Sequence, residues 1–136
     1  MATISLMLIF NTSAGLAGCG IDAENADRFA RWKREGREPS PLIFSTREIG
    51  HCASLPDEPG GFCASFCCKE AVFKALGQPF NGPECELFWM PDTEQYSIGL
   101  SERLRADYRL SGGRAVVEMH PPGEFVVQAY LFRDGE

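Results

Sequence analysis

Apolar residues recur along the chain in short runs whose spacing predicts both strands and helices. Runs rich in β-branched and aromatic residues predict strands at residues 3–10, 16–22, 84–90, 95–100, 114–120 and 125–133. The last two runs flank the turn sequence Pro121-Pro122-Gly123, so we expect them to pair as an antiparallel hairpin.

Start and stop signals predict helices at residues 26–36, 45–55, 62–76 and 102–110, with a loop at 37–41 and a turn at 56–61. Ser45-Thr46-Arg47-Glu48 is a capping box that begins the second helix. The third helix is the longest and ends at Gly77. Because it is apolar or small nearly all round, we expect it to be buried.

Strands and helices do not alternate strictly, which predicts an α+β fold with an antiparallel sheet packed on the long helix at 62–76. The chain has 136 residues, which is the size of one domain spanning 1–136. Acidic residues outnumber basic ones by 19 to 13, for a net charge of −6. This balance argues against general nucleic-acid binding, which needs a basic surface.

Positive charge is concentrated in residues 28–37, which contain five basic residues and one acidic residue, Glu35. This segment has a net charge of +4, and because the whole chain carries −6, the rest carries −10. Such a cluster is either a solvated helix face or a docking surface for an acidic partner, and we favour docking.

Six cysteines occur without any Cys-x-x-Cys pair: Cys19, Cys52, Cys63, Cys67, Cys68 and Cys85. We interpret them as reduced thiols that act as small apolar residues, which is typical of a cytoplasmic protein. A zinc site formed by Cys63 and Cys67 with Cys52 or Cys85 is a less favoured alternative, because thiolate zinc sites use tighter pairs.

Leu16-Ala17-Gly18-Cys19 is typical of a bacterial lipoprotein cleavage site, which would make the chain an exported lipoprotein. However, residues 1–11 contain no Lys or Arg, and the apolar run at 5–10 is shorter than an export signal requires. The run is also far too short to span a membrane. We therefore favour a buried strand, no membrane segment and a cytoplasmic location.

Two groups of charged residues are candidates for chemistry. Asp22 and Glu24 project to the same side if the strand continues, and two carboxylates at that spacing can hold a hard cation. Glu70 and Lys74 are four residues apart on the long helix, the spacing of an ordinary surface ion pair. If that helix is buried, however, its charges need a metal or counter-ion, which favours a functional site.

Three motifs in order resemble those of the 4′-phosphopantetheinyl transferases. The first is Gly20-Ile21-Asp22-Ala23-Glu24, and some 45 residues later comes Phe-Cys-Cys-Lys-Glu-Ala-Val-Phe-Lys-Ala-Leu-Gly, residues 66–77. Between them, residues 42–49 are similar to the family's middle motif. The chain length is that of the single-domain holo-acyl-carrier-protein synthase group, whereas the Asp-x-Glu form is similar to the larger members.

The resemblance implies transfer of the phosphopantetheine arm of coenzyme A to a serine of a carrier protein, leaving 3′,5′-ADP. Asp22 and Glu70 match the carboxylates that bind Mg²⁺, and Glu24 matches a third carboxylate of the larger group. Lys69 and Lys74 match lysines that face the coenzyme A phosphates, and Glu48 matches the acid of the middle motif. Asp22, Glu70 and Lys74 are then the expected catalytic residues.

The resemblance also implies an acidic acyl carrier protein docking on the basic helix through Arg28, Arg31 and Arg34, and a homo-oligomer, with a trimer favoured. Of the family's C-terminal Ser-x-Ser-His-like segment only His120 remains, and it is either a coenzyme A contact or a solvated turn residue. This departure leaves an alternative function open. The chain would then be a degenerate, non-catalytic relative that binds carrier protein or coenzyme A.

Overall fold

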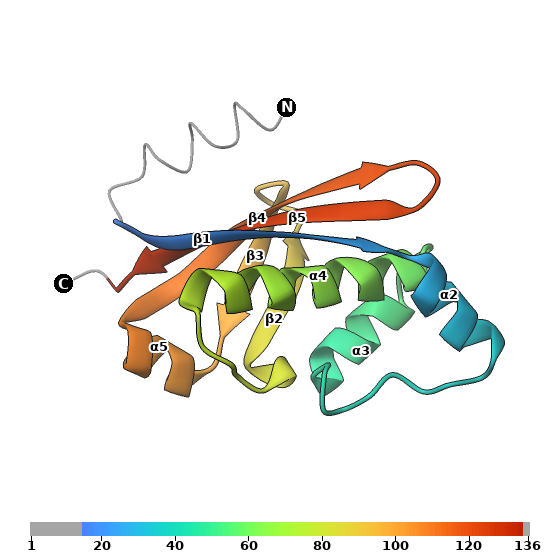
Figure 1. Cartoon of the computed structure of the whole chain (residues 1–136), viewed down its shortest axis with the longest axis horizontal. Helices are drawn as coiled ribbons and strands as arrows, with labels where there is room; N and C mark the ends of the chain where they lie inside the picture. Colours follow the sequence, from blue (N-terminus) through green and yellow to red (C-terminus); the bar gives the residue numbers. More distant parts are fainter. Residues whose placement is uncertain (1–14, 135–136) are drawn as a thin grey trace.

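The computed structural model describes residues 15–134 (Figure 1). Its elements are, in chain order, β1 (Leu16–Asn25), α2 (Asp27–Arg34), α3 (Thr46–Ala53), α4 (Glu58–Leu76), the 3₁₀ turn η1 (Gly82–Glu84), β2 (Cys85–Met90), β3 (Gln95–Leu100), α5 (Glu102–Tyr108), β4 (Leu110–His120) and β5 (Glu124–Arg133). This arrangement confirms the α+β prediction. The strand predicted at residues 3–10 lies outside the described residues.

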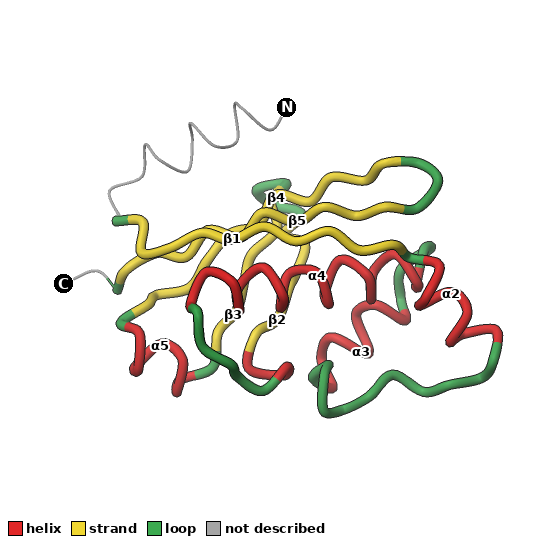
Figure 2. The backbone as a smooth tube through the Cα atoms, in the orientation of Figure 1, coloured by secondary structure: helices red, strands yellow, loops and turns green. Residues whose placement is uncertain are grey.

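All neighbouring strands pair antiparallel in one five-stranded sheet of order β1-β5-β4-β3-β2 (Figure 2). The predicted hairpin is confirmed, with His120 opposite Glu124 at its tip. Asp22 of β1 lies opposite Val127 of β5. The strand predicted at 16–22 is longer than expected and continues to Asn25, which brings Glu24 into β1.

Helix α4 packs along one face of the sheet, beside β1, with α2 and α3 next to its N-terminal half (Figure 1). Its buried side includes Cys67 and Val72, which pack in the core with Val127 of β5. Gly20 of β1 lies directly under the helix, and a Cβ at this position would collide with the carbonyl oxygen of Ala71. The helix can approach β1 this closely only because Gly20 has no side chain.

The helix ends follow local hydrogen bonds. The capping box is confirmed: the Ser45 side chain accepts a bond from the Glu48 backbone, and the Glu48 carboxylate accepts one from the Ser45 backbone. The prediction of a turn through residue 61 is wrong, because α4 already begins at Glu58. The Asp57 carboxylate caps it by accepting a bond from the Gly60 N–H at 3.0 Å. Proline is tolerated in a first helical turn, whose N–H groups are unpaired anyway, so Pro59 does not stop the helix.

The end of α4 is as predicted, with Gly77 in the left-handed conformation at φ 71°. The basic helix is shorter than expected and ends at Arg34. None of the helices within residues 15–134 is long and apolar enough to cross a membrane.

Candidate active site

Asp22 and Lys74 form the centre of the site, where β1 faces α4. The Lys74 Nζ donates to Asp22 Oδ1 at 2.8 Å and to the Ile21 carbonyl oxygen at 3.1 Å. The Asp22 side chain is only 14% exposed, whereas that of Lys74 is 54% exposed and reaches the carboxylate from solvent. The hydrogen bond to Asp22 raises the pKa of Lys74 above its ordinary value.

The second oxygen of Asp22 faces Cys67. The Cys67 Sγ lies 3.6 Å from Asp22 Oδ2, and the thiol also lies 3.7 Å from the Phe125 carbonyl oxygen. Burial raises the pKa of the Cys67 thiol far above its ordinary value. The thiol therefore stays protonated and can donate a hydrogen bond. Both carboxylate oxygens of Asp22 thus have a donor on α4. The sequence analysis assigned no such role to Cys67.

Glu70 lies on the same side of α4. It is three residues after Cys67 and four before Lys74, and residues at these spacings share a helix face. Since both of those residues contact Asp22, that face is the one turned toward β1. The Glu70 carboxylate also contributes to the raised pKa of Lys74. The structure therefore brings Asp22 and Lys74 together and places Glu70 near Lys74 on the same helix face.

The donor chemistry of this pair of carboxylates fits a hard divalent cation. Mg²⁺ is usually bound by one or two carboxylates together with substrate phosphates. Within the described part of the chain, no three His, Cys, Asp or Glu side chains cluster closely enough to hold a metal. Asp22 and Glu70 thus suit a cation shared with a phosphorylated substrate, whereas the alternative of a cysteine zinc site is not formed.

Glu24 does not join Asp22 and Glu70 in a cluster of three carboxylates. Its Oε1 lies 3.6 Å from Arg28 Nη2, four residues on, because β1 leads directly into α2. The Arg28 guanidinium lies over the aromatic rings of Phe29, Trp32 and Phe66, at 5.0, 5.5 and 4.7 Å from their centres. The carboxylate expected to be a third metal ligand is therefore ion-paired with an arginine, which is itself packed on aromatic side chains.

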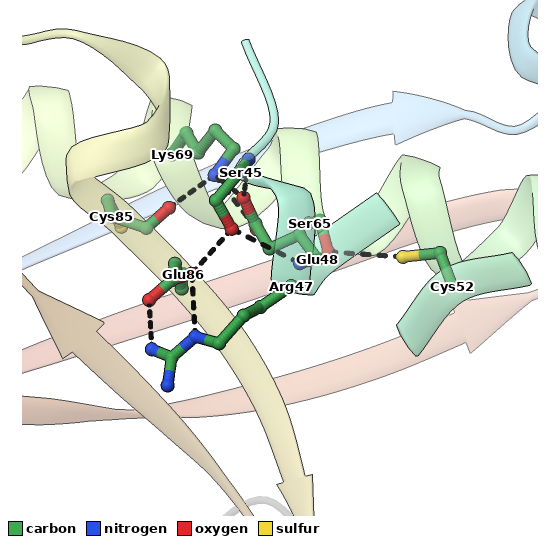
Figure 3. Close-up of polar contacts among 8 residues, drawn as sticks. All are labelled: Ser45, Arg47, Glu48, Cys52, Ser65, Lys69, Cys85 and Glu86. Carbon is green, nitrogen blue, oxygen red and sulfur yellow. Dashed lines mark hydrogen bonds and ion pairs between the residues drawn. The ribbon is translucent and has the colours of Figure 1, made fainter. Parts of the chain in front are cut away.

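Lys69 also lies apart from Asp22. Its side chain is buried between α4, α3 and β2, where Nζ donates to Glu48 Oε1 and Oε2 at 2.7 and 2.8 Å and to the Cys85 carbonyl oxygen (Figure 3). Burial raises the pKa of Glu48, and the Lys69 ammonium opposes this shift. The placement corrects the expectation that Lys69 faces a phosphate, because its ammonium points into the core. Nothing in the spacing of Glu48 and Lys69 signalled that they pair.

His120 is exposed at the tip of the β4–β5 hairpin, with its Nε2 3.3 Å from Glu118 Oε2. Asp22 lies opposite Val127, three positions along β5 from the partner of His120. Within residues 15–134 His120 makes no polar contact with Asp22, Glu70 or Lys74.

The charged side chains of α2 fall into two classes. Arg31 and Arg34 are exposed and form no ion pair within the described residues. Arg28 is packed as described above, and Lys33 lies 3.9 Å from Glu58 of α4. The exposed positive charge of this helix is thus carried chiefly by two arginines.

All six cysteines are unpaired thiols, and five of them are buried, in agreement with their interpretation as small apolar residues. Cys19 is the exposed one and lies inside β1, opposite Tyr130 of β5. Cleavage before Cys19, as the lipoprotein alternative requires, would remove the first residues of this strand.

Comparison with known proteins gives one consistent family. A model of the 4′-phosphopantetheinyl transferase superfamily matches residues 18–121. A holo-[acyl-carrier-protein] synthase of Rhodopirellula baltica is 41% identical over 44 residues, which is 32% of this chain and only 35% of that protein. The match to this relative therefore spans about a third of its length.

Solved structures show the same fold. The holo-[acyl-carrier-protein] synthase of Neisseria meningitidis superimposes with a TM-score of 0.72 at 14% identity, over 86% of this chain and 98% of the other. The enzyme of Helicobacter pylori, solved in complex with coenzyme A, gives 0.66 at 20% identity, over 83% and 98%. At these identities the likeness establishes the architecture.

Proposed function

The chain belongs to the 4′-phosphopantetheinyl transferase superfamily, and on that premise we propose that it transfers the phosphopantetheine arm of coenzyme A to a serine of an acyl or peptidyl carrier protein. The observation that carries the proposal is the ion pair of Asp22 with Lys74 at the β1–α4 contact, next to Glu70 on the same helix. The three residues come from the two segments that resemble the family's motifs, which supports their assignment to one site.

In this reaction a bond forms between the serine oxygen and the β-phosphorus of coenzyme A, and the bond from that phosphorus to the 3′,5′-ADP oxygen breaks. Asp22 and Glu70 would hold Mg²⁺, which neutralises charge on the pyrophosphate oxygens when bound. Lys74 is a point charge suited to the remaining phosphate oxygens, and its side chain is 54% exposed.

The serine hydroxyl must lose its proton as it attacks. The Glu70 carboxylate is the proposed acceptor, either directly or through a water molecule. Half-buried on α4, it is held on the same face as Lys74. Apart from this proton transfer, the side chains position the reactants and neutralise charge, as is general for transfer of phosphoryl groups.

An acidic carrier protein would dock on α2. Arg31 and Arg34 supply exposed charge without a competing ion pair in the described part of the chain, and complementary charge steers such encounters. Arg28, the third expected docking residue, would contribute mainly by fixing α2 against Phe66 of α4.

We place the activity in a single domain covering 1–136, in the cytoplasm, and in a homo-oligomer with coenzyme A at its interfaces, with a trimer favoured. The side of β1 that faces away from α4 carries the exposed residues Cys19, Ile21 and Ala23. Ile21 is 51% exposed, and a subunit interface would cover it. Light scattering that finds only monomers would contradict the oligomer.

Intact-protein mass spectrometry tests the function. An apo carrier protein incubated with this protein, coenzyme A and Mg²⁺ should gain the mass of one phosphopantetheine arm, and Glu70→Gln should prevent the gain. If several carriers gain nothing while calorimetry still detects coenzyme A binding, the non-catalytic alternative is correct.

A further inference from the structure

Glu48 and Lys69 form a fully buried ion pair beside the candidate active site. Their exposed side-chain fractions are 0% and 6%, and Figure 3 shows them pointing toward one another between α3 and α4. The two Glu48 oxygens and the Cys85 carbonyl oxygen take up the three N–H bonds that an ammonium can donate. Lys69 is therefore satisfied from both α3 and β2.

Stability does not explain why such a pair is present. Burying two charges removes their hydration, and apolar residues of equal volume are often as stable or more so. The pair instead fixes the orientation of the Lys69 side chain, because its ammonium donates to three acceptors that are held on α3 and β2. This arrangement opposes rotation of α4 about its own axis.

The acceptor side is itself rigidly held. Glu48 Oε1 also accepts the Ser45 N–H at 3.1 Å, and the Ser45 hydroxyl donates to Glu86 of β2. Arg47 donates to the same Glu86 carboxylate at 2.6 Å (Figure 3). Helix α3 and strand β2 thus form one hydrogen-bonded frame, to which α4 is attached through Lys69.

Glu70 follows Lys69 directly and projects about 100° further around the helix, toward β1. Fixing the direction of Lys69 therefore fixes that of Glu70. A helix rotation of about 10° moves a side-chain tip at a radius of about 5 Å by about 1 Å. A displacement of that size at a reacting group can lower the rate about 100-fold.

We propose that Glu48 and Lys69 are positioning residues that hold the Glu70 carboxylate in place beside Asp22. The inference rests on the proposed function for the role of Glu70, and it assigns Lys69 to the frame of the site. Within the described residues, neither side chain of the pair hydrogen-bonds to Asp22 or Lys74.

The test replaces the pair by neutral residues of similar volume in Glu48→Gln/Lys69→Met, which leaves no buried charge without a partner. The glutamine side chain retains an oxygen that can accept the capping bond from Ser45. Thermal unfolding reports stability, electron paramagnetic resonance with Mn²⁺ reports binding to the carboxylates, and steady-state kinetics with carrier protein report kcat and KM. Arg105→Met is the control, because Arg105 is exposed on α5 and belongs neither to the hydrogen-bonded frame nor to α4.

We expect the double variant to keep its melting temperature, to bind Mn²⁺ about tenfold more weakly and to lose kcat about 100-fold with KM for the carrier unchanged. Arg105→Met should match the wild type in all three measurements. If the double variant does not fold, Lys69→Arg takes its place, because it keeps the charge but redirects the donors.

A lower melting temperature with unchanged Mn²⁺ affinity and kcat would overturn the inference, because the pair would then be purely structural. Failure of the proposed function has a different signature. In that case the wild type transfers nothing to any carrier, whereas the Mn²⁺ measurement still decides whether the pair positions the carboxylates.

Discussion

The carboxylate of Asp22 and the ammonium of Lys74 lie 2.8 Å apart although 52 residues separate them in the sequence. In this arrangement each charge neutralises the other. If Lys74 moved to pair with a phosphate, the Asp22 carboxylate would lose its counter-ion. Another cation would then have to bind Asp22 to compensate its charge. We therefore expect the site to bind an anion and a cation together.

Mg²⁺ should therefore tighten the binding of coenzyme A. In isothermal titration calorimetry we expect the Kd for coenzyme A to fall at least about tenfold on adding Mg²⁺. Asp22→Asn should lose most of this Mg²⁺ dependence. The variant lacks the carboxylate charge that would bind Mg²⁺, and it lacks the ion pair with Lys74 that competes with phosphate binding. An exposed arginine elsewhere, Arg105, provides the control in Arg105→Met. Equal coenzyme A affinity with and without Mg²⁺ in the wild type would contradict the prediction.

Charge reversal on α2 should weaken docking of the carrier protein. We expect Arg31→Glu/Arg34→Glu to raise KM for an acidic carrier about tenfold at low salt and to leave KM for coenzyme A unchanged. The difference from wild type should shrink as ionic strength rises, because exposed charges are screened. Steady-state kinetics across a salt series measures this, with Arg105→Glu as a control outside the helix. A difference that is constant across the series would exclude electrostatic docking.

The Cys67 thiol should matter as a hydrogen-bond donor to Asp22. Cys67→Ser keeps a donor and should retain most of the activity, whereas Cys67→Val removes it and should lower Mn²⁺ affinity and kcat about tenfold. Both variants should have similar melting temperatures, which separates the donor's effect from packing. If serine and valine reduce the metal affinity equally, the thiol acts only through its volume.

Acid should remove one identifiable contribution to stability. Arg103 donates two hydrogen bonds of 2.7 Å to Glu84, and this interaction lowers the pKa of Glu84 from 4.5 to about 2. A lowered pKa in the folded state stabilises the protein above pH 4.5, and the contribution disappears as the pH falls toward 2. Because Arg103 is half exposed, we expect the loss to be about 1 kcal/mol.

Urea unfolding at about pH 7 and about pH 3 measures this contribution. Glu84→Gln should show a smaller change in unfolding free energy between the two pH values than the wild type does. An identical change in both proteins would exclude the Glu84–Arg103 pair as the source.

Sequence patterns predicted most of the elements because strands, caps and helix stops are local properties. The capping box at Ser45 and the C-terminal hairpin depend on neighbouring residues alone. The first turn of α4 was missed because Gly60 and Gly61 are typical of turns, whereas the Asp57 cap decides the helix start. Residue preferences therefore mispredict a helix start where one capping hydrogen bond outweighs the low helix propensity of the residues that follow.

The site was only partly predictable for a related reason. Asp22 and Lys74 were identified by motif and form an ion pair, but the partners of Glu48 and Glu24 depend on which helix faces lie together. Expected burial of the helix predicted at 62–76 suggested that its three charges, Lys69, Glu70 and Lys74, needed counter-ions. It did not show that Lys69 finds its partner on one side of the helix and Lys74 on the other.

The absence of a side chain at Gly20 sets the separation between β1 and α4, because the two backbones meet there directly. The contact lies two residues before Asp22, and on the helix it lies between Cys67 and Lys74. The β1–α4 contact that closes the hydrophobic core is therefore also the contact that places the candidate catalytic residues. Packing of the core thus also sets the distance between the strand that carries Asp22 and the helix that carries Lys74.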